Sequence, residues 1–199
     1  MSPVFDPQPV LLEGRHVRLE PLAPPHAEGL FAASRAAGIW TYLLVQQFVS
    51  VAAVNDWIAE ARRAQAAGSE VAFATVRRSD GRVVGSTRYL EIRRAHRALE
   101  IGWTWLAPEA QRTPINTEAK YLMLRHAFEA LGAVRMQLKT DARNEKSRRA
   151  ILRLGATEEG TLRKYQTRFD GYVRDTVMFS LTAADWPVVN ARLEERLGR

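Results

Sequence analysis

The amino-acid sequence predicts a single mixed α/β domain, with a largely antiparallel central sheet and helices on both faces. Two observations lead to this fold class. Segments that alternate apolar and polar residues are interleaved with segments whose apolar residues recur at helical spacing. The chain has 199 residues, of which 46% are hydrophobic and 26% are charged, as in one ordinary globular domain.

The N-terminal part predicts one strand followed by two helices. Residues 16–21 alternate apolar and polar side chains, as a half-buried strand does. A helical region opens at Pro24-Pro25, because proline fits the first turn of a helix. A second helix is expected around Trp57, and it ends near Gly68.

Three strands come next. Residues 71–76 and 83–89 predict a hairpin across Asp80-Gly81, because this dipeptide supplies the positive φ values that a tight turn needs. The third strand alternates bulky apolar residues with small or acidic ones. We therefore expect Glu100 on the face opposite the apolar residues. Those apolar residues are Leu99, Ile101, Trp103 and Trp105.

The following segment predicts the most clearly periodic helix of the chain, at roughly 117–131. Its start is marked by Thr113-Pro114 or by Asn116-Thr117, and Gly132 can take the left-handed position after its end. A strand at 134–138 and a short helix at 147–154 follow.

The last part of the chain predicts a hairpin and a final helix. Residues 161–169 and 172–181 are expected to pair across Asp170-Gly171. Thr182 or Asp185 caps the final helix. The apolar stripe of this helix consists of Trp186, Val189, Leu193 and Leu197.

Several kinds of chemistry are excluded or disfavoured by residues and motifs that the sequence lacks. There is no cysteine, which excludes disulfides, cysteine-ligated zinc, iron–sulfur clusters and an acyl-cysteine intermediate. No G-x-G, G-K-[ST] or G-x-S-x-G motif occurs, which disfavours Rossmann, Walker-type and hydrolase sites. The four histidines have no metal-binding spacing, and we expect no metal ion.

The formal net charge is +7, and it is concentrated in two stretches. Residues 77–97 and residues 143–174 each carry a net charge of +5. Because there is no basic tail or Lys/Arg block, a disordered nucleic-acid arm is not expected. Two interpretations stay open, a folded surface that meets a polyanion and a pocket for a phosphorylated ligand.

The sequence also bears on the compartment. No run of 18 apolar residues occurs, and residues 1–9 are rich in proline rather than basic and then apolar. We therefore expect no membrane span, no secretory leader and a cytoplasmic location.

Five segments, in the correct order, resemble the RimJ/RimL-type branch of the GNAT acetyltransferase superfamily. They are residues 12–22 (LEGRHVRLEPL), 99–103 (LEIGW), 117–120 (TEAK), 144–147 (NEKS) and 154–163 (LGATEEGTLR). The resemblance implies the GNAT, or acyl-CoA N-acyltransferase-like, fold, in which a splayed sheet binds acetyl-coenzyme A between two central strands. It predicts an N-terminal extension at 1–11, the acetyltransferase domain at 12–185 and a C-terminal helix at 186–199 packed on the same domain.

By this resemblance the protein transfers an acetyl group from acetyl-CoA to a primary amine, in a ternary complex. Direct attack needs no protein nucleophile, in agreement with the absence of cysteine. Glu100 is the candidate general base, because bulky neighbours can raise the pKa of a strand carboxylate. The alternative is that Glu100 only pairs with one of the nearby arginines.

Asn144 and Ser147 lie three residues apart at a predicted helix start, which places both polar groups at the same mouth. The resemblance assigns Asn144 to the pantetheine arm and places Ser147 near the sulfur, as proton donor or positioning group. The alternative is that either residue is simply a helix N-cap.

The pyrophosphate loop, residues 111–117, departs from the family pattern. Arg112, Pro114 and Asn116 stand where glycines, or an alanine at the last position, are expected. Either the anion site has degenerated, or helix amides persist and polar side chains replace the glycines. The predicted cofactor contacts are Trp105, Leu106, Arg112, Thr113, Ile115, Asn116, Thr117 and Lys120, and the alternative for Lys120 is a solvated helix face.

The acceptor side is expected around the early helices and the last hairpin. The aromatic residues there are Trp40, Tyr42, Tyr89, Tyr165 and Phe169. The predicted partner is a small-molecule or peptide amine, including a protein N-terminus, with no nucleic acid and no membrane, and the resemblance allows a homodimer. The alternative function is a non-catalytic GNAT-like module that binds CoA or an amine through a degenerate loop.

Overall fold

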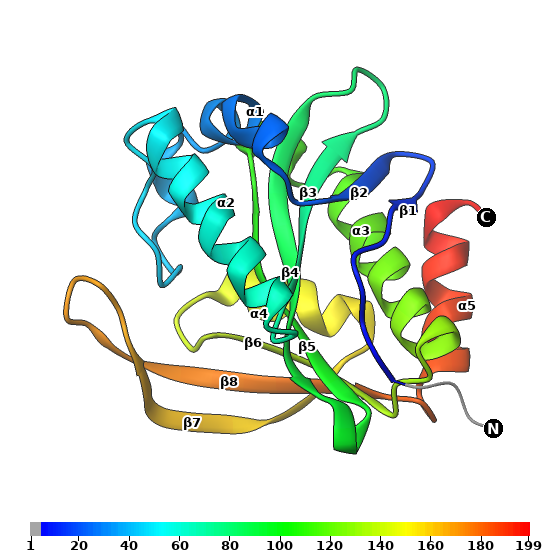
Figure 1. Cartoon of the computed structure of the whole chain (residues 1–199). Coiled ribbons are helices and arrows are strands. Elements are labelled where there is room, and N and C mark those ends of the chain that lie inside the picture. Colours follow the sequence, from blue (N-terminus) through cyan, green and yellow to red (C-terminus); the bar gives the residue numbers. More distant parts are fainter. Residues whose placement is uncertain (1–4) are drawn as a thin grey trace.

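The computed structural model describes residues 5–199, which form one eight-stranded sheet in the order β1-β2-β3-β4-β5-β6-β8-β7 (Figure 1). In the described residues β5 and β6 are parallel, and the other neighbouring strands are antiparallel. The strands are β1 (Leu12–Glu13), β2 (Val17–Pro21), β3 (Val71–Arg77), β4 (Val83–Arg93), β5 (Ala98–Leu106), β6 (Arg135–Asp141), β7 (Thr157–Thr167) and β8 (Val173–Thr182). The predicted fold class is confirmed.

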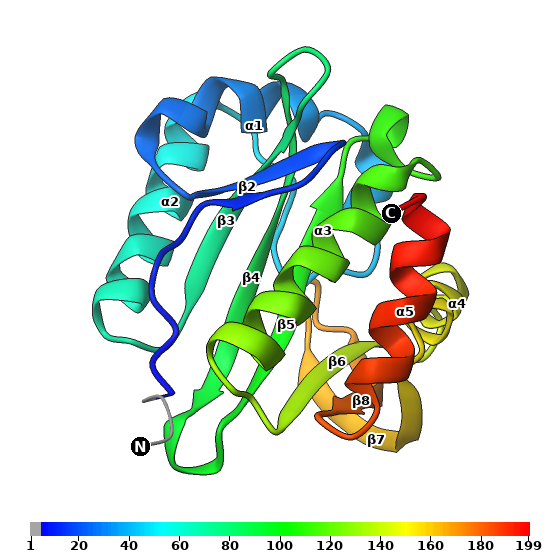
Figure 2. The same cartoon turned by 90° about the vertical axis from the view of Figure 1, so that its right-hand side faces the viewer.

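Helices cover both faces of the sheet, as Figure 2 shows. One layer holds α1 (Ala27–Ala33) and α2 (Val51–Ala66). The other holds α3 (Pro114–Arg125), α4 (Glu145–Leu154) and α5 (Trp186–Leu197). The buried residues form two separate clusters, because the sheet divides the apolar side chains of the first layer from those of the second.

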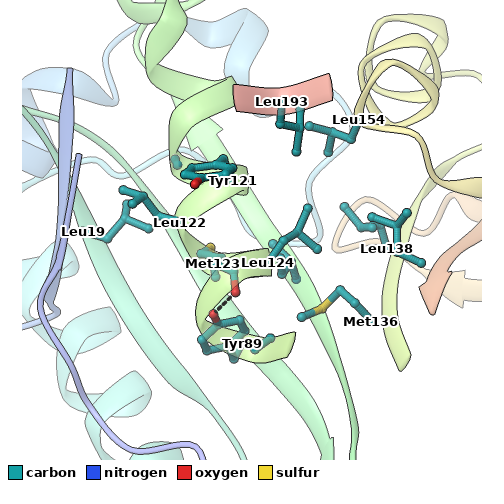
Figure 3. Packing of buried hydrophobic residues seen from close by; sticks show 14 of the residues in the cluster. Leu19, Tyr89, Tyr121, Leu122, Met123, Leu124, Met136, Leu138, Leu154 and Leu193 are labelled. Atoms are coloured by element: carbon teal, nitrogen blue, oxygen red, sulfur yellow. Dashed lines mark hydrogen bonds between the residues drawn. The ribbon is translucent and has the colours of Figure 1, made fainter. Parts of the chain in front are cut away.

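The core around α3 is drawn in Figure 3, where Tyr121, Leu122, Met123 and Leu124 lie among buried residues of the sheet, of α4 and of α5. Tyr89 belongs to this core, and its hydroxyl donates a hydrogen bond to the carbonyl of Met123 at 2.5 Å. The expectation that Tyr89 lines the acceptor side is therefore wrong. Its strand position turns the ring towards α3.

Strands β5 and β6 stay together only at their first residues. Pairing runs from Ala98 to Glu100 on β5 and stops at Gln137 on β6. Beyond this point β5 continues to Leu106 with β4 as its neighbour, while β6 continues beside β8. The sheet is thus splayed between its two central strands, with Glu100 at the last paired position.

A β-bulge in β5 changes which face its aromatic residues occupy. Trp103 has φ 49°, and the register with β4 jumps by one residue there. Leu99 and Ile101 lie in the α3 core, whereas Trp105 lies in the α2 core. Trp103 stacks on Arg88 of β4 on the α2 side. The predicted common face for all four apolar residues is wrong, because simple alternation cannot anticipate the extra residue.

Several local expectations are confirmed. Gly81, Gly132 and Gly155 have positive φ at the turn or helix ends where the sequence placed them. The stripe of the last helix is buried, and Asp185 is its N-cap residue without a capping side-chain bond. The long helix differs, since it begins at Pro114 and continues into a π-helical turn at His126–Ala130.

The N-terminal extension is described from residue 5 onward. Phe5 is buried in the α3 core, and Asp6 pairs with Arg94 at 3.0 Å. Residues 1–4 of the predicted extension lie outside the described part. Within residues 5–199, no helix combines the length and apolar character needed to cross a membrane.

Candidate active site

Glu100 lies at the point where β5 and β6 separate, and only 1% of it is exposed. Lys139 of β6 is 3.0 Å from Oε2, and the side-chain amide of Gln137 donates to the same oxygen at 2.8 Å. The expected pair with an arginine is wrong in its partner, because the ion pair forms with Lys139. Gln137 and Lys139 of β6 thus orient the carboxylate through one of its oxygens, Oε2.

Burial raises the pKa of Glu100, while the charge of Lys139 and the Gln137 hydrogen bond oppose this effect. Gly102 leaves room for the carboxylate, since a Cβ at this position would lie 2.9 Å from Glu100 Oε1. A carboxyl whose pKa is raised by burial is a stronger proton acceptor than an ordinary carboxylate, as a general base requires.

The turn after β6 positions the start of α4. The backbone amide of Asn144 donates to the carbonyl of Asp141 at 2.9 Å. Asn144 Oδ1 accepts a hydrogen bond from the amide of Ser147 at 3.1 Å, so Asn144 is the N-cap of α4. The capping alternative is confirmed for Asn144 and wrong for Ser147. The side-chain amide nitrogen of Asn144 has no hydrogen-bond partner among residues 5–199 and stays open to a ligand.

The loop before α3 keeps the backbone of a glycine at one position. Arg112 has φ 60°, in the left-handed region, which costs about 1–2 kcal/mol for a residue with a Cβ. Pro114 occupies the first helical position, where its missing N–H is no loss. The chain therefore retains this turn despite both substitutions.

Fewer helix amides are available at this loop than a glycine-rich loop offers. Thr113 caps the helix by accepting from the amide of Ile115 at 3.3 Å, and its hydroxyl donates to Ala110. In a regular helix the amide of Thr117 bonds to the carbonyl of Thr113. The Asn116 amide is thus the helix donor left for an anion, while the side chain of Ile115 is buried in the core.

Lys146 of α4 contacts this loop, although the sequence analysis did not name it as a site residue. Lys146 Nζ donates to Gln111 Oε1, and Gln111 Nε2 in turn donates to the carbonyl of Leu106 at 2.8 Å. The link joins the end of β5 to the first turn of α4. The signal was present in the sequence, because Lys146 stands two residues after the N-cap Asn144.

Lys120 was expected to contact the cofactor or to lie on a solvated helix face, but its side chain is buried between α3 and the sheet. Only 5% of it is exposed, so the alternative of a solvated helix face is wrong. Its Nζ donates to Thr104 Oγ1 at 2.5 Å and to Thr87 Oγ1 at 3.2 Å, between α3 and the sheet. Desolvation lowers the pKa of Lys120 from 10.5 to about 7. The Lys120 side chain thus binds β5 at Thr104, next to the bulge at Trp103.

The remaining predicted cofactor residues lie at the end of β5. Trp105 is buried against Trp40, with their ring centroids 5.5 Å apart. Trp40 is therefore a core residue. Leu106 is buried in the α3 core and presents its carbonyl to Gln111. Both residues shape the wall that leads into the loop.

A cavity of about 430 Å³ lies at the last hairpin, in the region expected for the acceptor. Of the predicted aromatic residues Tyr42 lines it, while Tyr165 and Phe169 are exposed on the hairpin. The lining residues are Thr41, Tyr42, Arg143, Arg168, Asp170 and Tyr172.

Much of the positive charge is compensated by ion pairs. Examples are Arg88 with Glu70 at 2.6 Å and Arg78 with Glu13 at 3.3 Å. A second cavity of about 450 Å³ adjoins the N-terminus of α3. Arg15, Arg77 and Arg78 are among its lining residues, so part of the first basic stretch does lie beside the loop.

Comparisons with known proteins agree on one family. The family model described as "Acetyltransferase (GNAT) domain" matches residues 16–157. The chain is 25% identical over 171 residues to the N-acetyltransferase YoaA of Bacillus subtilis, a protein named as uncharacterized, covering 86% of this chain and 96% of YoaA.

Solved structures are similar over almost the whole chain. A GCN5-related N-acetyltransferase from Brucella melitensis has a TM-score of 0.91 and 31% identity, covering 98% of this chain and 88% of that one. RimJ of Mycobacterium smegmatis, solved in complex with CoA-disulfide, has a TM-score of 0.82 and 24% identity, covering 100% of this chain and 98% of its own.

Proposed function

This chain belongs to the GNAT acetyltransferase family, and from that premise we propose that it transfers the acetyl group of acetyl-CoA to a primary amine by direct attack in a ternary complex. It is an N-acetyltransferase. The likeness to RimJ supports the RimJ/RimL-like branch. The observation that carries the proposed mechanism is Glu100, a buried carboxyl with a raised pKa at the divergence of β5 and β6.

The residues at the mouth of the splayed sheet fit coenzyme A. Arg112 lies in the loop before α3, and Lys146 contacts Gln111 of the same loop. Together with the Asn116 amide these two cations are the kind of donor set that binds a diphosphate. Asn144 has a free side-chain amide for the pantetheine arm, and Ser147 follows it at the same mouth. When bound, acetyl-CoA supplies the acetyl group as a thioester.

Glu100 accepts the proton that the acceptor amine loses as its nitrogen bonds to the acetyl carbon and the C–S bond breaks. A raised pKa keeps this carboxylate basic enough for the role, directly or through one water. Lys139 and Gln137 hold Oε2, which leaves Oε1 on the side of Gly102. The departing sulfur takes a proton, for which the Ser147 hydroxyl is the proposed donor.

The proposed acceptor class is the amine of a small molecule or peptide, protein N-termini included, and the proposed location is the cytoplasm. The cavity at the last hairpin supports this acceptor class because it is large enough for one or two residues of a peptide.

The deciding experiment is an acetylation assay with a panel of amines and N-terminal peptides, read as release of free CoA thiol. We expect acetyl-CoA-dependent release with at least one acceptor. Calorimetry with acetyl-CoA tests the alternative of a binding module, which would bind without turnover. No binding at millimolar acetyl-CoA would refute the proposed function.

A further inference from the structure

Three segments that are distant in the sequence form the hairpin cavity. Thr41 and Tyr42 come from the α1–α2 connection, Arg143 comes from the turn after β6, and residues 168–172 come from the β7–β8 hairpin. Its volume of about 430 Å³ is in the range of small-ligand sites. The cavity is thus a built site with two guanidinium groups in its lining.

This cavity lies on the same face of the sheet as Glu100. Along β6, Lys139 and Asp141 alternate with buried core residues and share the face of Glu100. Asp141 pairs across the sheet with Thr176 of β8, and Arg174 lies two residues further on the same face. A row of charged side chains therefore leads from the candidate base to the cavity.

Arg143 is held so that it can bind a ligand. Its Nε lies 3.3 Å from Asp141 Oδ1, and its guanidinium lies 3.6 Å from the centre of the Tyr172 ring. About half of the side chain, 51%, is still exposed. The ion pair and the stacking fix the plane of the guanidinium, while the remaining N–H groups have no partner within residues 5–199.

Arg168 is more deeply placed, with 9% of its side chain exposed. It lies 3.2 Å from Asp170 and donates to the carbonyl of Thr41. Its Nε is buried and has no hydrogen-bond partner in the described structure. An unpaired buried donor of this kind costs stability unless a ligand pairs with its group.

Arg174 adds a positive charge behind the cavity. It is 5% exposed, and its guanidinium donates to Thr176 Oγ1 at 3.1 Å and to the carbonyl of Tyr42 at 3.2 Å. Within residues 5–199 no carboxylate lies within ion-pair distance of it. Burial lowers the pKa of Arg174, although the negative charges of Asp141 and Glu100 oppose this effect.

The charges around the cavity do not balance. Lys139 and Glu100 neutralise each other, and Asp141 and Asp170 are paired with Arg143 and Arg168. Arg174 is left in excess, so an additional anion would be stabilised here. A simple ammonium ion would instead be repelled.

We infer that the acceptor amine carries an anionic group, such as a carboxylate, which binds Arg143 and Arg168 in the hairpin cavity while the amine points towards Glu100. This inference rests on the proposed acetyltransferase function. Two sources share the chemistry, a free amino acid and a peptide with an acidic residue next to its N-terminus. The surrounding positive charge also lowers the pKa of the amine, which favours the neutral form that attacks.

The test compares acceptors that differ only in the anionic group. One pair is glycine and glycinamide, and the other is the peptide amides Gly-Glu-Gly-Gly and Gly-Gln-Gly-Gly. Values of kcat/KM are expressed per concentration of unprotonated amine, because the amide raises the neutral fraction of glycinamide. We expect the anionic member of at least one pair to be favoured about tenfold, as one charge-assisted hydrogen bond provides.

Variants separate local recognition from long-range attraction. Arg143→Gln should reduce the preference to about twofold or less, and Arg143→Lys, which keeps the charge, should retain part of it. Arg63→Gln removes the same charge from the exposed face of α2 and should keep the full preference. Thermal unfolding checks that each variant is folded.

The outcomes distinguish this inference from the proposed function. Equal turnover of both members of both pairs overturns the inference and leaves the acetyltransferase function intact. A preference that Arg143→Gln leaves unchanged, or that Arg63→Gln abolishes equally, also overturns it. No CoA release with any amine refutes the function and the inference together.

Discussion

Replacing Lys120 by methionine should stabilise the protein at neutral pH, although it removes two hydrogen bonds. Lys120 is buried between α3 and the sheet, and its Nζ contacts the hydroxyls of Thr87 and Thr104. Among the residues that the structure describes, no carboxylate pairs with it. Desolvation lowers its pKa from 10.5 to about 7. A fall of this size means that the buried lysine lowers the free energy of unfolding by about 5 kcal/mol at pH values below the folded-state pKa.

The sign follows from proton binding. Between pH 7 and about 10.5 the unfolded lysine holds a proton that the folded lysine has released. The free energy of unfolding therefore rises by about 1.4 kcal/mol per pH unit in this window. The stability that Lys120 costs is about 4 kcal/mol at pH 7 and about 2 kcal/mol at pH 9.

The two hydrogen bonds that the methionine variant loses offset part of this gain in stability. Each bond that is lost with Lys120 is worth about 1 kcal/mol. The hydroxyls of Thr87 and Thr104 lie 2.8 Å apart, so we expect them to keep their bond to each other in the variant. Lys120→Met should thus be about 2 kcal/mol more stable than the wild type at pH 7 and about equal to it at pH 9.

Urea unfolding of the wild type and of Lys120→Met at pH 7 and pH 9 measures how the difference in their free energies of unfolding changes with pH. Lys164→Met, at an exposed position of β7, is the matched control and should show no change in the difference with pH. A stability difference for Lys120→Met that is the same at both pH values would refute the reasoning, because the buried lysine would then not titrate in this window.

The remaining predictions concern the site. Glu100→Gln should lower kcat by about 100-fold or more, with unchanged acetyl-CoA affinity in calorimetry; wild-type turnover would refute the base assignment. In the wild type, kcat/KM per concentration of unprotonated amine should fall as the pH decreases through the raised pKa of Glu100, and a profile with its midpoint at or below 4.5 would contradict this. Arg112→Ala and Lys146→Ala should each weaken CoA binding several-fold, and the loss should shrink at high salt; an unchanged Kd would mean that backbone donors suffice. Asn144→Ala should cost about 1 kcal/mol of stability in thermal unfolding, as loss of an N-cap does, and Asn144→Ser should restore most of it.

Positions whose conformation depends on neighbours in the sequence could be predicted. Gly132 and Gly155 end helices because only their own backbone conformation and the preceding helical pattern matter there. The Asp170-Gly171 turn and the buried stripe of α5 were predictable for the same reason. The site residues Glu100 and Asn144 could likewise be named, since their strand and helix-start positions follow from short patterns and from the family resemblance.

Other properties depend on atoms that are distant in the sequence. The extra residue at Trp103 moves the following aromatic side chain to the α2 face, and that shift needs β4 as the pairing partner. The ion pair of Glu100 with Lys139 exists because β6, a parallel strand that follows β5 only after α3, pairs with β5 up to Glu100.

By itself, the sequence determined the order of strands and helices, the family and the candidate base, because these depend on local periodicity and on short motifs. Only the tertiary structure decided that Lys120 is buried and that three segments enclose the hairpin cavity. The physical reason is that burial and charge balance are sums over neighbours in space, so a lysine that local spacing would leave in solvent is desolvated once the sheet and α3 close over it.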